Sequence, residues 1–348
     1  MSRAYLDHAA TTPLHPAARA AMVEALERWH NPSSPHAEGR AAKAELEEAR
    51  RRVADALGWS GSVIFTSGAS EALAIALGRA KAGPRFVSTV EHDAVFRAAP
   101  DAHRLSVGRD GIVNLDAIEG DRPLVAVQHA NNETGVIQPL DRIADEVRRP
   151  GGLLLSDCAQ SAAKLPLPDA DLIALSAHKF GGPPGVGALL VRDLTLIEPI
   201  GGQEQGYRPG TQNLPGIMGM AAALESDRDW MEVAGQLRQR LEAAILGSGG
   251  EMVAAQSPRI ATIGAYRMPG VPANAQLIQF DMDGLAVSAG SACSSGSLKP
   301  SHVLSAMGWD ETSASEVGRV SFGRFTTAAE VDRFAALWSE MAARRRAA

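Results

Sequence analysis

The chain has 348 residues, and its 34 lysines and arginines against 40 aspartates and glutamates leave a formal net charge of −6. This balance argues against a nucleic-acid-binding protein, and no apolar run is long enough to make the chain a membrane protein. Because the two cysteines lie far apart, at positions 158 and 293, and the N-terminus has no apolar signal-peptide stretch, we expect a cytoplasmic protein without disulfides.

Residues 38–59 begin a pattern in which helices alternate with short apolar runs. They carry one apolar residue per helical turn, which predicts an amphipathic helix that ends at Gly58. This stripe consists of Ala42, Leu46, Ala49, Val53 and Leu57. Residues 62–68 then predict a strand and a turn, and residues 69–80 predict a second helix.

Further apolar runs continue this alternation. They occupy residues 85–90, 123–130, 151–160, 170–179 and 185–192, with a helical segment at 140–149. Strands that alternate with helices predict an α/β fold, with a mostly parallel central sheet covered on both faces.

The pattern changes near residue 230. A long helical stretch at 229–246 leads into shorter segments, and a terminal helix is expected over 327–348. We therefore expect a large domain over 15–230, and a small α+β domain built from 1–14 and 231–348.

Four predicted strands of the large domain end in polar residues: TSGAS (66–70), HANNE (129–133), SDCAQ (156–160) and SAHK (176–179). In such sheets, ligands bind where strands end and loops begin. The TSGAS turn precedes a helix, so its backbone N–H groups with Ser67 or Ser70 suit a phosphate, although a serine there is more often only an N-cap. A Walker sequence is absent, and GVGALL lacks the third glycine of a dinucleotide fingerprint.

Lys179 and Asp157 suggest a particular chemistry. A lysine at a strand end can form a Schiff base with an aldehyde cofactor, although most loop lysines are simply solvated. Asp157 closes an apolar strand, where a carboxylate is costly to bury unless it meets a cation such as a protonated pyridine nitrogen. Three residues at the end of another strand, His129, Asn131 and Asn132, can hydrogen-bond a phenolic oxygen.

Cys293 lies in the stretch SAGSACSSGS, without the apolar neighbours of a core cysteine. Taken alone, it is equally well explained as an exposed loop thiol without a function. Cys158, between Asp157 and Gln160, is expected to be a small packing residue.

Ten motifs along the chain resemble those of cysteine desulfurases, which are pyridoxal-phosphate-dependent enzymes of the class-V aminotransferase family, of the iron–sulfur and nitrogenase group. The motifs are YLDHAATTPLHP, HNPSSPHAEGRAAK, VIFTSGASEALAIAL, EHDAV, HANNETGVIQPL, SDCAQSAAKLPL, SAHKFGGPPGVGALLVR, YRPGTQNLPGI, LAVSAGSACSSGSLKPSHVL and GRVSFGRFTT. The resemblance implies the fold type I of pyridoxal-phosphate-dependent transferases. It also implies conversion of L-cysteine to L-alanine, with the sulfur held as a persulfide on Cys293.

The resemblance further implies a role for each matching residue. Lys179 would be the Schiff-base lysine and base, His92 would stack on the cofactor ring, and Asp157 would hold the pyridine nitrogen. Arg319 and Asn132 would bind the substrate carboxylate. The remaining cofactor-binding positions are Asn132 and Gln160 at the ring oxygen, Ser70, Ser176 and His178 at the phosphate, and Ala69. Thr211 would reach the phosphate of a second subunit, which implies a homodimer.

Some positions depart from the family pattern, and rival functions remain open. Ser70 stands where threonine is usual, Ala177 where glycine is common, and Gln205 and Tyr207 where arginine is frequent. The cysteine loop lies at about 288–300, and the segment before it looks shortened.

The alternatives to a cysteine desulfurase are a selenocysteine lyase, an aminotransferase without need of Cys293, and a non-catalytic paralogue. The sulfur acceptor, an iron–sulfur scaffold or a thiolation enzyme, is left open.

Overall fold

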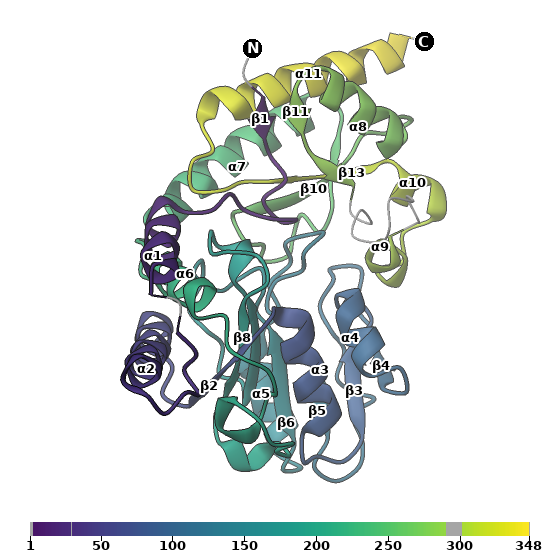
Figure 1. Cartoon of the computed structure of the whole chain (residues 1–348). Helices are drawn as coiled ribbons and strands as arrows, with labels where there is room; N and C mark the ends of the chain where they lie inside the picture. Colours follow the sequence, from purple (N-terminus) through teal and green to yellow (C-terminus); the bar gives the residue numbers. More distant parts are fainter. Residues whose placement is uncertain (1–2, 29, 290–300, 348) are drawn as a thin grey trace.

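The computed structural model describes residues 3–28, 30–289 and 301–347. A seven-stranded sheet forms its centre, and six of the strands run in the same direction (Figure 1). In spatial order these strands are β2 (Ser62–Thr66), β8 (Gly187–Val191), β7 (Leu172–Ser176), β6 (Leu153–Asp157), β5 (Leu124–Ala126), β3 (Arg85–Ser88) and β4 (His103–Leu105). Only β8 is antiparallel to its neighbours, so the predicted mostly parallel sheet is confirmed.

Successive residues of a strand point to opposite faces of the sheet, and in these strands the residues on both faces are apolar. Helices therefore cover both faces of the sheet. On one face, Ile64 and Ala174 pack with the helices α3 (Ala69–Arg79) and α4 (Asp93–Ala98). On the other, Phe65 and Leu175 pack with α2 (Ala37–Leu57), α5 (Leu140–Arg148) and α6 (Leu214–Leu224). The helix α1 (Pro16–Leu26) lies against α6.

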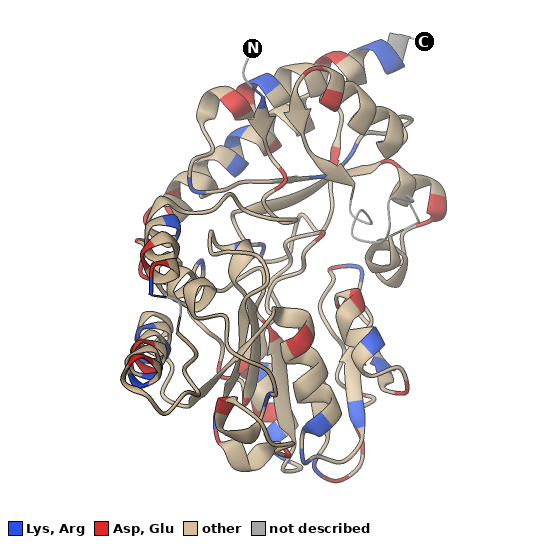
Figure 2. Cartoon of the chain, viewed as in Figure 1, with Lys and Arg blue, Asp and Glu red and all other residues tan. Residues whose placement is uncertain are grey.

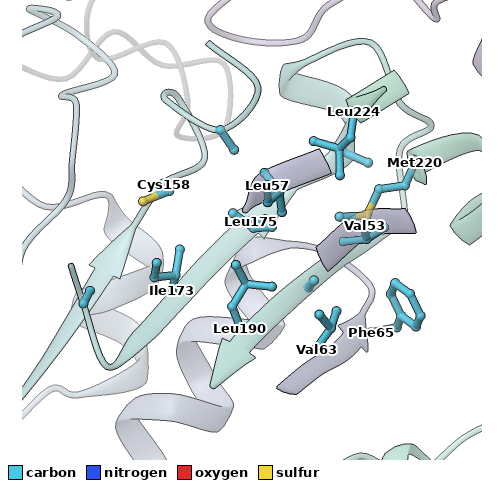
Figure 3. Packing of buried hydrophobic residues seen from close by; sticks show 14 of the residues in the cluster. Val53, Leu57, Val63, Phe65, Cys158, Ile173, Leu175, Leu190, Met220 and Leu224 are labelled. Carbon is cyan, nitrogen blue, oxygen red and sulfur yellow. The ribbon is translucent and has the colours of Figure 1, made fainter. Parts of the chain in front are cut away.

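The predicted helix over 38–59 is confirmed within two residues at each end. Every residue of its apolar stripe is buried, and Gly58 ends the helix in the left-handed conformation, with φ 65°. Figure 3 shows Val53 and Leu57 of this helix packed near Val63 and Leu175 of the sheet. The outer helices carry charges of both signs without separation (Figure 2), as expected for solvated faces.

A second sheet lies beside the large one. It is antiparallel, in the order β12 (Ser288–Ala289), β13 (Val317–Ser321), β10 (Ile263–Arg267) and β9 (Glu251–Met252). Its core includes Tyr266, Phe280, Phe334 and Trp338, which join it to the long helices α7 (Trp230–Gly247) and α11 (Ala328–Ala347) and to α8 (Ala273–Met282). The short elements are β1 (Ala4–Tyr5), which pairs with β11 (Leu285–Ala286), and the helices α9 (His302–Ala306) and α10 (Glu311–Ser315).

The N-terminal segment connects the two sheets. After β1, Asp7 bridges to Ser321 in the second sheet, and the Thr12 N–H then donates to the main-chain oxygen of His178 beside the large one. The domain boundary near residue 230 stays a prediction. Within the described residues, no helix has both the length and the apolar character needed to cross a membrane.

Candidate functional site

A cavity of about 350 Å³ opens at the edge of the large sheet where its parallel strands end. Parallel strands bring their carboxyl ends to one edge, so segments far apart in sequence meet there. A Cβ at Gly187 would lie 2.6 Å from the Cα of Gly68, so β8 can begin against the turn after β2 only with glycine there.

The cavity brings together nine of the predicted site residues. They are Ala69, Ser70, His92, Asn132, Asp157, Gln160, Ser176, His178 and Lys179. Thr211 and Arg319 do not line it, and Cys293 lies outside the described residues. Lys179 after β7, Asp157 at the end of β6 and the TSGAS turn after β2 therefore meet at one cavity, as their positions at strand ends predict.

Lys179 follows β7 in a short 3-10 turn, η1 (Ala177–Lys179). Its Nζ donates hydrogen bonds to the main-chain oxygens of Ala9 (2.6 Å) and Ala10 (2.8 Å). The N-terminal segment therefore packs over the amine, which faces the cavity from the end of a rigid strand.

Asp157 ends β6 and is buried. Its Oδ1 accepts from the Ala159 N–H at 2.8 Å. Burial raises the pKa of the Asp157 carboxyl, and the Ala159 N–H, His92 and Lys179 act in the opposite direction. A cation placed in the cavity would offset this cost of burial, since an opposite charge favours the ionised carboxylate.

His92 is the N-cap of α4, and its Nδ1 accepts from the Ala94 N–H at 3.1 Å. Burial lowers the pKa of this imidazole, an effect that Asp157 opposes and Lys179 reinforces. The ring is therefore neutral near pH 7 and is held by its backbone contact in the wall of the cavity.

Of the three residues His129, Asn131 and Asn132, which were predicted to hydrogen-bond the ring oxygen, only Asn132 lines the cavity. Asn131 instead shapes the next turn, since its Oδ1 accepts from the N–H groups of Glu133 (2.9 Å) and Thr134 (2.8 Å). His129 is also absent from the cavity wall, and burial lowers its pKa to about 4. The structure therefore does not place His129 or Asn131 in the wall of this cavity.

Arg319 is almost completely buried, in β13. Its guanidinium donates to Asp7 Oδ1 at 2.7 Å and to the main-chain oxygen of Asn132 at 2.9 Å. Its Nε has no hydrogen-bond partner among the described residues. Arg319 thus lies behind Asn132, and its neighbour in the sheet is Ser288 of β12, the strand that precedes the cysteine loop.

Several residues of the site were not found from the sequence. Glu71 and Gln128 line the cavity, and Asp7 pairs with Arg319. Glu71 lies in the first helical turn, where an acidic residue is readily explained as a partner of the helix dipole. Asp7 lies within the motif LDHAATT, but its partner is 312 positions away.

Pyridoxal phosphate fits the cavity. A ligand of its size is typically held in a space of 300 Å³ or more, lined by a few polar groups. The Gln160 amide has an oxygen without a partner among the described residues, while its Nε2 donates to the Ala9 oxygen at 2.9 Å. A polar ring substituent would satisfy this amide, Asp157 would receive a ring cation, and the turn of residues 67–70 would receive the phosphate.

Lys164 is expected to make stability depend on pH. It is buried, and with the partly buried Lys179 it lines a small second cavity, which His8, His15 and Arg324 also line. Burial, reinforced by Lys179, lowers the pKa of Lys164 from 10.5 to about 7. Between these values the unfolded chain binds the extra proton, so the free energy of unfolding rises with pH, by a few kcal/mol in all.

Lys164→Met is expected to be more stable than the wild type at pH 7, with the difference shrinking toward pH 10. Urea unfolding of both proteins at the two pH values measures this. The same pH dependence in both proteins would contradict the assignment.

The comparisons with known proteins agree with this geometry. The profile of the class-V aminotransferase family matches residues 4–334. A cysteine desulfurase of Cereibacter sphaeroides is 37% identical over 96% of this chain and 94% of its own length. An IscS-like cysteine desulfurase of Mycobacterium tuberculosis is 39% identical over 94% of this chain and 93% of its own. The crystal structure of a NifS-like protein from Rickettsia africae superimposes with a TM-score of 0.89, at 28% identity, covering 97% of this chain and 99% of that one. The chain therefore belongs to the class-V aminotransferase family and, within it, to the pyridoxal-phosphate-dependent cysteine desulfurases.

Proposed function

We propose that this chain converts L-cysteine to L-alanine and passes the sulfur to Cys293 as a persulfide. The observation that carries the proposal is the convergence of Lys179, Asp157 and His92 in one cavity. The strand next to Arg319 leads directly into the segment that contains Cys293.

The chain's own residues bind and orient the reactants. When bound, pyridoxal phosphate supplies the electron sink that weakens bonds at the substrate's α-carbon. Lys179 holds the cofactor and moves the α-proton with its Nζ. Asp157 would pair with the pyridine nitrogen and favour its protonated form, and the neutral imidazole of His92 would contact the ring from the cavity wall.

Arg319 and Asn132 bind the substrate carboxylate. An arginine already held by Asp7 presents a fixed guanidinium, whose planar N–H groups match a carboxylate. Cys293, as the thiolate, attacks the sulfur of the bound substrate. The carbon–sulfur bond breaks, a sulfur–sulfur bond forms, and a proton returned to the substrate β-carbon completes alanine.

The test is to supply L-cysteine and a thiol reductant to the purified holoenzyme and to quantify alanine and sulfide together. Equal amounts of the two are expected. L-selenocysteine in a parallel reaction separates a desulfurase from a selenocysteine lyase, because the second enzyme would release selenide and leave L-cysteine unused. Failure to release alanine from L-cysteine would overturn the proposal.

We infer that the enzyme is a homodimer in which Thr211 reaches the cofactor phosphate of the other subunit. Thr211 is exposed and does not line its own subunit's cavity, which supports a role across an interface. We further propose that the protein works in the cytoplasm, where a reactive thiol stays reduced, and that an iron–sulfur scaffold or a thiolation enzyme accepts the sulfur.

Thr211→Ala is expected to weaken cofactor binding by about 10- to 100-fold, the loss of one hydrogen bond to a charged group. Mixing this variant with Lys179→Ala tests the shared site. Mixed dimers contain one site with both Lys179 and Thr211, so activity at low cofactor concentration should return. Dimers that exchange subunits without regaining activity would contradict the shared site.

A further inference from the structure

Glu71 places a carboxylate in the wall of the cavity, beside the turn of residues 67–70. Its Oε2 accepts a hydrogen bond from the Ser67 N–H at 2.5 Å. Burial favours its protonated form, but the hydrogen bonds from Ser67 and Arg208 prevail and lower the pKa of Glu71. A negative charge thus lies beside the turn that is expected to receive a phosphate dianion. Two negative charges close together repel each other, so the Glu71 charge alone would weaken phosphate binding.

Arg208 provides the compensating charge. Its Nε donates to Glu71 Oε1 at 3.0 Å, and its side chain is only about one-fifth exposed, at 19%. Arg208 is not part of the phosphate turn. It comes from the segment 203–213, which contains the 3-10 turn η3 (Glu204–Gly206) and leads into α6.

The segment 203–213 is anchored by Glu204, whose side chain is completely buried. The Glu204 carboxylate accepts from Arg50 Nη1 at 2.7 Å, from the Phe65 N–H at 2.8 Å and from Gln212 Nε2 at 3.0 Å. Phe65 lies in β2, the strand that runs into the phosphate turn. The fold therefore fixes the backbone on both sides of Arg208 relative to that turn, so the ion pair with Glu71 forms without a backbone rearrangement.

We propose that Arg208 is a positioning residue for the cofactor phosphate, because it neutralises Glu71 and holds that carboxylate against the Ser67 N–H. The turn of residues 67–70 then accepts a dianion although a carboxylate lines the same wall. This inference rests on the proposed use of pyridoxal phosphate and adds what makes the site selective for the phosphorylated cofactor.

The test compares two aldehydes that differ only in the phosphate. Pyridoxal phosphate and pyridoxal are titrated separately into the cofactor-free form of the full-length chain. The variants are Arg208→Met, Glu71→Gln and the double substitution. The matched control is Arg52→Met, which removes an arginine of α2 that pairs with Glu225 through two bonds of 2.7 Å, away from the cavity.

Arg208→Met leaves Glu71 uncompensated, so the affinity for pyridoxal phosphate is expected to fall about 10- to 100-fold. The affinity for pyridoxal should stay within about twofold, because its binding involves no phosphate charge. The double substitution removes both charges and should recover most of the loss. Arg52→Met should bind both aldehydes as the wild type does.

Two results would overturn the inference. An equal loss of affinity for both aldehydes in Arg208→Met would mean that Arg208 only supports the local structure. Failure of the double substitution to recover binding would mean that the Glu71 charge is not what Arg208 compensates. A wild-type protein that binds neither aldehyde would instead overturn the proposed function, and this inference with it.

Discussion

Replacement of Cys293 by serine is expected to abolish the release of alanine and sulfide from L-cysteine, while cofactor binding remains. A serine hydroxyl stays protonated at neutral pH, whereas a thiol is partly ionised and is a far stronger nucleophile toward sulfur. The assay is the paired measurement of alanine and sulfide on the holoenzyme. Mass spectrometry of the wild type, after L-cysteine without reductant, should find one added sulfur atom on the peptide that contains Cys293.

Cys158 offers the matched control, because the chain has only two cysteines. Cys158 is fully buried in the core of the large sheet (Figure 3), and burial raises the pKa of its thiol to about 12. Its thiol donates to Ser156 Oγ at 3.6 Å, so it is bound within the core. Cys158→Ala should therefore keep the activity. If Cys293→Ser kept it as well, the persulfide mechanism would be wrong.

The residues that flank the cysteine segment support this prediction. Before it, β12 pairs with the part of β13 that holds Arg319. After it, the Ser301 hydroxyl donates to Glu133 Oε2 at 2.5 Å, and Glu133 follows Asn132, which lines the cavity. Both ends of the segment that carries Cys293 are thus held near the predicted site of the substrate carboxylate.

Lys179→Ala is expected to lower turnover by at least about 10³-fold, since it removes both the attachment of the cofactor and the group that moves the α-proton. Asp157, His92 and the phosphate turn remain, so the cofactor should bind, but reversibly. Borohydride reduction followed by mass spectrometry should attach the cofactor to the Lys179 peptide in the wild type and to no peptide in the variant.

Lys164→Met is the control for this experiment, because Lys164 lies beside Lys179 but is absent from the wall of the main cavity. It should retain the attached cofactor. Attachment at a lysine other than 179, or near-normal turnover of Lys179→Ala, would contradict the role given to Lys179.

Much of the large domain and several candidate site residues could be predicted from local sequence patterns. The helix at 37–57 and the buried strands β6 and β7 follow from apolar periodicity, which depends only on which faces of each element meet water. Lys179, Asp157 and the TSGAS turn were candidates because they end such strands. The antiparallel direction of β8 was not predictable in this way, since a run that is buried on both faces reads alike in either direction.

Glu204 shows where such reasoning fails. Within GGQEQG it resembles an exposed charge in a loop, yet its side chain is completely buried. It can be buried only because Arg50, 154 positions away, meets it with a guanidinium. The pairs Glu71–Arg208 and Asp7–Arg319 likewise join segments 137 and 312 positions apart.

The sequence by itself determined the main helices and strands of the large domain and the edge of the sheet that holds the chemistry, because these depend on local periodicity and on residues placed at strand ends, and its motifs indicated the family. Only the tertiary structure decided which charges meet. A buried charge is tolerated only beside its partner, and the partner is set by how strands and helices pack rather than by any neighbouring residue. The ion pairs that support the cofactor site, Asp7–Arg319 and Glu71–Arg208, could therefore be identified only in the folded chain.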